Sequence, residues 1–354
     1  MNESNQSYEN GSEEYYHRCM DLYSGPMYSE PTWLQVLFGV IFGLITVLGI
    51  GGNAIVCYIV LGHRRMRTVT NYFVVNLAVS DQLMAVMCVN FTFYTTLYMT
   101  WPFGLVMCKA VSFFQSVSVS VSIFTLVAIS MERYMAIIHP LRPRLGNTGT
   151  LLVIALIWIS SCALGLPTVI YSLIYVEDGV TYCSEEDWKD RGNYSFATMV
   201  LTYFLPLGVL AMAYTRIGIR IWARKTPGEV EANRDRRMTE SKIRLVKMFA
   251  VIVFLFAVCY LPIHTFNIVQ DIHKSVVLCY PYIRVIYVVV IAVAMSNCVY
   301  NPFIYCWMNS KFRDGFRKVL RCLPVLRRSR NQASHSSSFR GLKRTSTLNT
   351  HMQS

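Results

Sequence analysis

Residues 111–134 read VSFFQSVSVSVSIFTLVAISMERY, and the first nineteen of them, Val111 to Ile129, carry no charge. An α-helix of about 20 apolar residues crosses the ~30 Å hydrocarbon core of a bilayer, so this stretch predicts a membrane-spanning helix. The acid Glu132 and the base Arg133 follow at the depth where such a helix meets water. An arginine there is costly unless it is paired, so we expect the two side chains to hold each other. The pair is either a breakable latch or only an anchor at the membrane surface.

Serine and valine alternate from Ser116 to Ser122, which is the period-two signal of a strand. An open strand cannot span lipid, because its backbone groups would lack partners. A serine in a helix can bond its own backbone or a neighbouring helix. We therefore predict that this stretch is helical.

Composition extends the prediction to the whole chain. It has 354 residues, of which 54% are hydrophobic and only 15% charged, with a mean hydropathy of +0.38. Soluble domains carry roughly 25% charged residues, so the deficit indicates several long apolar segments. The seven expected segments are 33–61, 71–98, 105–138, 149–171, 196–224, 242–271 and 281–307. The predicted fold class is an all-α membrane protein, a seven-transmembrane helix bundle with a short amphipathic eighth helix.

The connections between these segments alternate in charge. Those at 63–67, 142–144 and 216–247 are basic, whereas 176–191 has six acids against two bases. Basic loops stay in the cytoplasm, so we expect the N-terminus outside and the C-terminus inside. The net charge of +13 follows this loop pattern and does not indicate nucleic-acid binding.

The expected domains follow from this orientation. They are an extracellular glycosylated N-terminus (1–32), the bundle (33–307), an amphipathic membrane-surface helix (308–322) and a disordered cytoplasmic tail (323–354). Glycosylation is expected at the sequons of Asn2, Asn5, Asn10 and Asn193. Asn90 also begins a sequon, but it lies inside an expected helix. Cys322 follows the amphipathic helix and is either palmitoylated or an unmodified thiol.

Four cysteines are expected on the outer side, where the compartment is oxidising. Cys108 begins the third segment and Cys183 lies in the acidic loop, so we predict a disulfide between them. A second bridge between Cys19 and Cys279 is a further hypothesis, since it leaves no outer cysteine unpaired.

Polar residues inside the apolar segments form a second candidate site. Asp81, Asn53, Asn297 and Asn301 can gather into a buried cluster, and a carboxylate there would protonate or recruit a cation. Sodium suits these hard oxygen ligands at Asp81, Asn297 and Asn301. The alternative is a purely structural hydrogen-bond network. Kinks or hinges are expected at Pro167, Pro206, Pro262 and Pro302.

Landmarks in every segment resemble one family. They are Asn53, Leu77 to Asp81, Trp101 to Gly104, Cys108 with Cys183, Glu132-Arg133-Tyr134, Trp158, Pro206 with Tyr214, Phe256 to Pro262, and Asn301-Pro302-Phe303-Ile304-Tyr305. Together they resemble the rhodopsin-like (class A) G-protein-coupled receptors over about residues 30–322. One departure is Tyr260, where that family usually has tryptophan before Leu-Pro.

The resemblance implies a function and a set of switch residues. An outward pocket would bind ligand, and an inner face would open for a heterotrimeric G protein. The implied switch residues are Glu132, Arg133, Tyr134, Tyr214, Pro262, Asn301, Pro302 and Tyr305. Arrestin and receptor kinases would act at the phosphorylated tail, with membrane lipids around the bundle. No cofactor is implied apart from an allosteric sodium ion.

The resemblance also narrows the ligand class. Gln115 stands where receptors for amines have an aspartate, and 281–307 has no lysine for retinal. The run 134–144 resembles the peptide branch, which includes tachykinin, neuropeptide Y-like, RYamide and prokineticin receptors. Neuropeptide Y-like and RFamide receptors use the positions of Thr92, Gln115, Asn267 and Asp271. The pocket candidates are Thr92, Gln115, Tyr260, His264, Asn267 and Asp271.

These matches predict a specific contact. Asp271 would pair with a peptide arginine, and Gln115 with Thr92 would contact the amidated end. Otherwise Asp271 is a solvated helix-end acid, and Gln115 makes an interhelical hydrogen bond. His264 is expected to be a pocket wall rather than a pH sensor.

We therefore expect a plasma-membrane neuropeptide receptor for a basic amidated peptide of the Arg-aromatic-amide type. The alternative is a tachykinin-, kinin- or prokineticin-type ligand. A transporter is less favoured because the sequence shows no internal repeat. No nucleophile–base or metal constellation indicates an enzyme.

Overall fold

The structure is a computed structural model that describes residues 31–143, 145–185, 191–223, 232–272 and 282–322. The side chains of Asp271 and Cys322 lie outside this description. So do Cys19, Cys279 and the sequons at Asn2, Asn5 and Asn10, and the predictions made for them remain predictions.

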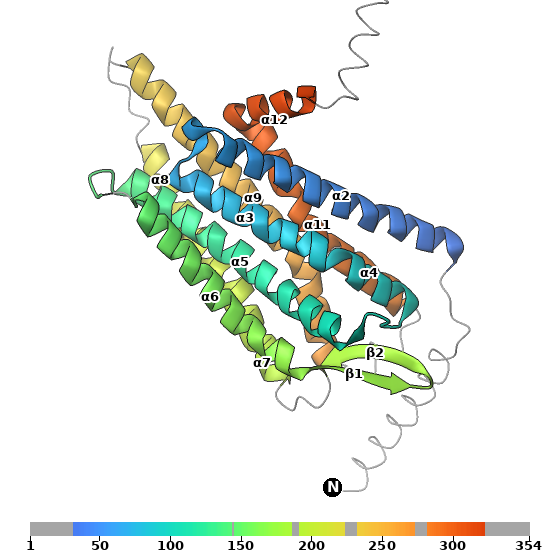
Figure 1. The fold of residues 1–354 in the computed structure, drawn as a ribbon. Coiled ribbons are helices and arrows are strands. Elements are labelled where there is room, and N and C mark those ends of the chain that lie inside the picture. Colours follow the sequence, from blue (N-terminus) through green and yellow to red (C-terminus); the bar gives the residue numbers. More distant parts are fainter. Residues whose placement is uncertain (1–30, 144, 186–190, 224–231, 273–281, 323–354) are drawn as a thin grey trace, which may run out of the picture.

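Seven helical spans form one bundle, which confirms the predicted fold class (Figure 1). The spans are α2 (Thr32–Gly62), α3 (Val69–Met87) with α4 (Val89–Tyr98), α5 (Gly104–Ile138), α6 (Asn147–Tyr171), α7 (Arg191–Met199) with α8 (Leu205–Ala223), α9 (Ala232–Ile272) and α11 (Ile283–Met308). A short 3-10 turn, η1 (Arg64–Met66), joins α2 to α3, and the amphipathic helix α12 (Ser310–Cys322) follows α11. The serine-valine alternation lies inside α5, as predicted.

Two spans are interrupted where the sequence predicted continuous helices. The second is divided at Cys88, a single turn residue between α3 and α4 with φ −116° and ψ −47°. The fifth contains a π-helical turn, η2 (Val200–Phe204), just before Pro206. A proline has no N–H to donate and its ring crowds the carbonyl four residues earlier. A wider π-turn accommodates that carbonyl, so Pro206 acts as the predicted irregularity.

The sixth apolar span, predicted at 242–271, agrees with the membrane-crossing part of α9, Ile243–Gln270. The helix itself begins earlier, at Ala232. The prediction followed apolar residues alone, and 232–241 is a charged stretch. A charged helix can extend beyond the hydrocarbon, because water solvates its side chains there.

The chain after α6 forms a hairpin, residues 172–185, that the sequence analysis did not predict and that overlaps the acidic connection 176–191. Strand β1 (Ser172–Glu177) pairs antiparallel with β2 (Val180–Glu185), with Ile174 opposite Cys183. Asp178 and Gly179 between them have φ of 50° and 78°. An Asp-Gly dipeptide with both residues at positive φ is a two-residue hairpin turn. That dipeptide was the missed signal.

The hairpin lies across one end of the bundle and α12 across the other (Figure 1). They are referred to below as the hairpin end and the α12 end. The long helix α5 packs against α3, α6 and α8 and runs between the two ends. A single helix therefore connects a covered end to the latch residues near its last turns.

Candidate functional site

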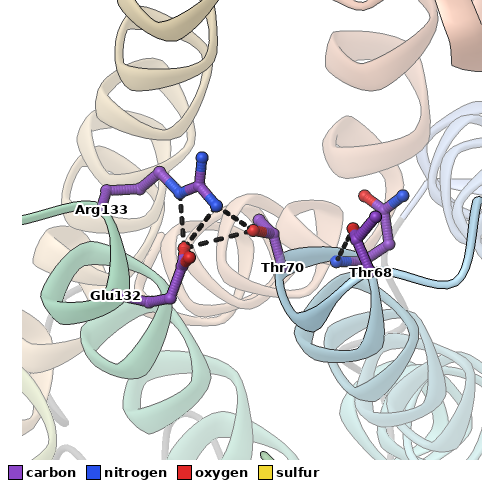
Figure 2. Close-up of polar contacts among 5 residues, drawn as sticks. Thr68, Thr70, Glu132 and Arg133 are labelled. Carbon is purple, nitrogen blue, oxygen red and sulfur yellow. Dashed lines mark hydrogen bonds and ion pairs between the residues drawn. The ribbon is translucent and has the colours of Figure 1, made fainter. Parts of the chain in front are cut away.

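The predicted pair of Glu132 and Arg133, called the latch below, is formed in the structure (Figure 2). Arg133 approaches one carboxylate oxygen of Glu132, Oε2, with both Nε and Nη2 at 2.5 Å. The two side chains are only 15% and 12% exposed, so each charge is largely desolvated and depends on the other. The ion pair offsets the free-energy cost of desolvating the arginine at this depth.

Thr70 completes the latch from α3. Its Oγ1 donates to Glu132 Oε2 at 3.2 Å and accepts a hydrogen bond from Arg133 Nη2 (Figure 2). Thr68 positions it, because its side chain caps α3 by accepting from the backbone N–H of Asn71. The sequence analysis missed Thr70, which lies 62 residues before Glu132 and has no local signal beyond a hydroxyl at a helix start.

Three of the other implied switch residues, all tyrosines, make contacts of their own. The phenol oxygen of Tyr214 accepts from Ser130 Oγ at 2.8 Å, so α8 is tied to α5 one turn before Arg133. The ring of Tyr305 lies 5.4 Å from that of Phe312 on α12, and its buried hydroxyl has no hydrogen-bond partner in the described part of the chain. Tyr134 packs with Ile137 and its neighbours on α8 and α9.

Asp81 and Asn301 come together in the middle of the bundle, as expected for the polar cluster. Asn301 Nδ2 donates to Asp81 Oδ2 at 2.7 Å, and the aspartate is 2% exposed. Asn297 is buried one turn earlier on α11. Asn53 has a different role, because its Nδ2 donates to the carbonyls of Gly49 and Cys298 and joins α2 to α11.

The donor chemistry of this cluster fits a sodium ion. Asp81 forms no ion pair with a described residue, so its charge at this depth would be uncompensated without a cation. The hydroxyls of Ser80 and Ser122 lie 2.9 Å apart beside it on α3 and α5. Carboxylate, amide and hydroxyl oxygens are the hard ligands that such a cation prefers.

The hairpin is fixed to the bundle by the predicted disulfide. Cys108 on α5 and Cys183 on β2 are bonded, and the Trp101 backbone N–H donates to the Thr181 carbonyl at 2.7 Å. Glu185 at the end of β2 pairs with Arg191 of α7 at 3.5 Å. Burial raises the pKa of the Glu185 carboxyl above its ordinary value, and Arg191 opposes that shift. The disulfide, the backbone hydrogen bond and the ion pair therefore fix the hairpin across this end of the bundle.

The candidate ligand residues occupy the half of the bundle nearer the hairpin. On α9, Tyr260 is buried and His264 half-buried one turn later, with the Tyr203 ring 4.7 Å from the histidine. Asn267, a further turn along, is exposed. These three positions lie along one side of α9 at helical spacing.

Two more candidates lie on neighbouring helices. Gln115 on α5 and Thr92 on α4 are half-buried, and neither side chain bonds another candidate in the described ranges. The side chain of Gln115 makes no hydrogen bond to any described residue, so the alternative of an interhelical bond finds no support. Asn193 is exposed on α7. Asn90 is also exposed, and its side chain accepts from Thr46 Oγ1 of α2 at 2.9 Å.

The sequence of the chain matches a known family. The chain matches the family described as "7 transmembrane receptor (rhodopsin family)" over residues 52–305. That range contains the latch, the disulfide, the polar cluster and the candidate ligand residues.

Individual relatives are similar over most of the chain. Tachykinin-like peptides receptor 99D of Drosophila melanogaster is 41% identical over 312 residues, 83% of this chain and 59% of the fly protein. The human Substance-K receptor is 38% identical over 302 residues, 84% of this chain and 76% of that one. The human Substance-P receptor is 40% identical over 305 residues, covering 84% and 74%. This chain thus spans about three fifths of the fly receptor's length and about three quarters of the human ones.

Proposed function

Because the chain belongs to the rhodopsin family of seven-transmembrane receptors, we propose that it binds a neuropeptide at its hairpin end and activates a heterotrimeric G protein at its α12 end. The hairpin end faces the outside of the cell and the α12 end the cytoplasm, as the basic connections favour. The family consists of receptors rather than enzymes, and the chain is a multi-pass membrane protein.

The similarity to tachykinin receptors supports a proposal for the ligand. Three receptors named for tachykinin-like peptides, Substance K and Substance P are 38–41% identical to this chain over more than 300 residues. We propose a tachykinin-like peptide, which was the alternative in the sequence analysis. The acidic connection that carries the hairpin would attract a basic peptide.

Activation is a shift between two populations. Peptide bound under the hairpin contacts α5 and α9, the helices that bear Gln115 and His264. It favours a state in which α9 moves about Pro262 and Arg133 leaves Glu132. The arginine then faces the G protein. The closed latch of the structure corresponds to the state without peptide.

An Arg-aromatic-amide peptide is the second candidate. It rests on the match of Thr92, Gln115, Asn267 and Asp271 to positions used by other peptide receptors. The half-buried Gln115, which lacks a partner in the described structure, favours a polar ligand group at that depth.

Sodium and the tail would regulate the same switch. Asp81, Asn297 and Asn301 would hold the ion, whose charge neutralises the carboxylate while agonist is absent. Receptor kinases and arrestin would act on the Ser/Thr-rich tail, where phosphate adds charge.

A peptide screen tests the proposal. Cells expressing the chain are challenged with tachykinin-like peptides, Arg-aromatic-amide peptides and their free-acid forms, and nucleotide exchange on the G protein is measured. We expect amidated tachykinin-like peptides to be the most potent. A preference for the Arg-aromatic amides would select the second candidate, and exchange that no peptide alters would refute the peptide assignment.

A further inference from the structure

A cavity of about 260 Å³ lies at the α12 end among α3, α5, α6 and the segment after α5. Most of its wall is apolar, formed by Phe73, Ala128, Met131, Met135, Leu145 and Val153. Its volume equals roughly eight or nine waters at ~30 Å³ each. That is room for part of a hydrocarbon chain rather than for a whole lipid.

The cavity opens sideways, onto the surface of the bundle that faces the membrane. Met131 and Leu145 in its wall are 42% and 43% exposed. On α6, which contributes Val153 to the wall, Leu151, Leu152 and Leu156 are exposed apolar side chains of a membrane-spanning helix. Such side chains face lipid, so a molecule entering the cavity comes from the bilayer rather than from water.

The polar part of the wall carries net positive charge. His139 and Arg142 line it beyond the last turn of α5, and Arg142 is exposed. Glu132 also lines it, but Arg133 neutralises that carboxylate. A cation beside the membrane surface attracts an anionic lipid headgroup.

We propose that this cavity binds an acidic phospholipid, with part of one acyl chain between α3 and α6 and its phosphate at Arg142. The inference rests on the proposed function only in assigning the α12 end to the cytoplasmic leaflet, where acidic lipids gather. A free peptide or nucleotide would not suit a mouth that faces hydrocarbon.

Occupancy would act on the latch. Glu132 forms part of the cavity wall while it holds Arg133 and Thr70. A ligand that binds this arrangement stabilises it against one in which Arg133 is released. The bound lipid therefore holds the receptor in its closed state.

Native mass spectrometry of the detergent-purified receptor tests the site. Phosphatidylserine is titrated against the wild type and three variants: Arg142→Gln, Ala136→Phe, which fills the cavity, and the control Arg64→Gln, an exposed arginine of η1 at the same end. We expect about fivefold weaker binding for Arg142→Gln, no bound lipid for Ala136→Phe, and no change for Arg64→Gln. Equal binding of phosphatidylcholine, or an equal loss with Arg64→Gln, would overturn the proposal. Because Arg142 is exposed, Arg142→Gln should leave the fold intact, and weaker lipid binding by this variant reports on the site itself.

Basal nucleotide exchange in nanodiscs tests the coupling. Adding phosphatidylserine to phosphatidylcholine discs should lower the basal exchange of the wild type and leave Arg142→Gln unaffected. If the wild type does not respond, the lipid does not act on the latch. The mass-spectrometric measurement of bound lipid requires neither peptide nor G protein. Loss of lipid binding can therefore be told apart from failure of the proposed receptor function.

Discussion

Thr70 is the residue that turns the Glu132–Arg133 pair into a link between two helices. Its hydroxyl serves both partners at once, accepting from the guanidinium and donating to the carboxylate. Adjacent residues on α5 can stay paired however α3 moves. The Thr70 contact breaks when α3 and α5 separate, so it makes the latch sensitive to helix motion.

Thr70→Val, which keeps the shape and removes the hydroxyl, should raise basal nucleotide exchange. A hydrogen bond to a charged group is worth about 1.5–3 kcal/mol, so the closed state should weaken roughly tenfold or more. Thr96→Val is the matched control, because among the described residues that hydroxyl bonds only the Thr92 carbonyl of its own helix. Equal basal exchange in the two variants would show that Thr70 does not hold the latch.

Asp271 distinguishes the two ligand candidates. If a peptide arginine pairs with this carboxylate, Asp271→Ala should weaken an Arg-aromatic-amide peptide by about 1.5–3 kcal/mol, ten- to a hundredfold. Replacing the peptide arginine with citrulline should have the same effect on the wild type and none on the variant. Competition binding measures both, and effects that simply add would exclude a direct contact.

At the scale of elements, the sequence predicted the membrane spans and the Glu132–Arg133 pair, because both depend on residues close together in the chain. The spans follow from apolar runs, and Glu132 and Arg133 are neighbours in the chain. The Thr70 contact depends instead on how distant helices pack, which one sequence does not display. The polar cluster lies between these cases. Its buried members were predictable, but only the structure shows that Asn301 binds Asp81 while Asn53 binds backbone carbonyls.

Helix α12 docks on α2 through a glycine that no larger residue can replace without movement. A Cβ added to Gly315 would lie 2.8–2.9 Å from three side-chain carbons of Ile59, and Phe312 beside it is fully buried. The amphipathic pattern predicted a helix on the membrane surface. It did not show that this helix also packs against the protein.

Gly315→Ala should therefore destabilise the bundle, although alanine favours helix. Overpacking costs about 1–3 kcal/mol, which exceeds the gain of ~1 kcal/mol in helix propensity. Gly218→Ala on α8 is the control, because no atom of the described residues lies within 4 Å of an added Cβ there. Thermal unfolding in detergent should show a lower Tm for the first variant and an unchanged or higher Tm for the second. A higher Tm for both would mean that α12 is not packed on Ile59.

At the scale of the whole molecule, the buried Asp81 lies between the two ends and joins α3 to α11. A cation bound there neutralises the carboxylate in the closed bundle, so sodium and agonist should oppose each other through one coupling free energy. Replacing choline with sodium at equal ionic strength should weaken agonist binding roughly fivefold, a typical lower bound for such coupling. Asp81→Asn keeps the shape and removes the charge, so it should abolish the difference. Equilibrium binding of labelled peptide measures both proteins. Sodium sensitivity that survives in the variant would place the ion elsewhere and leave the Asp81–Asn301 contact a structural hydrogen bond.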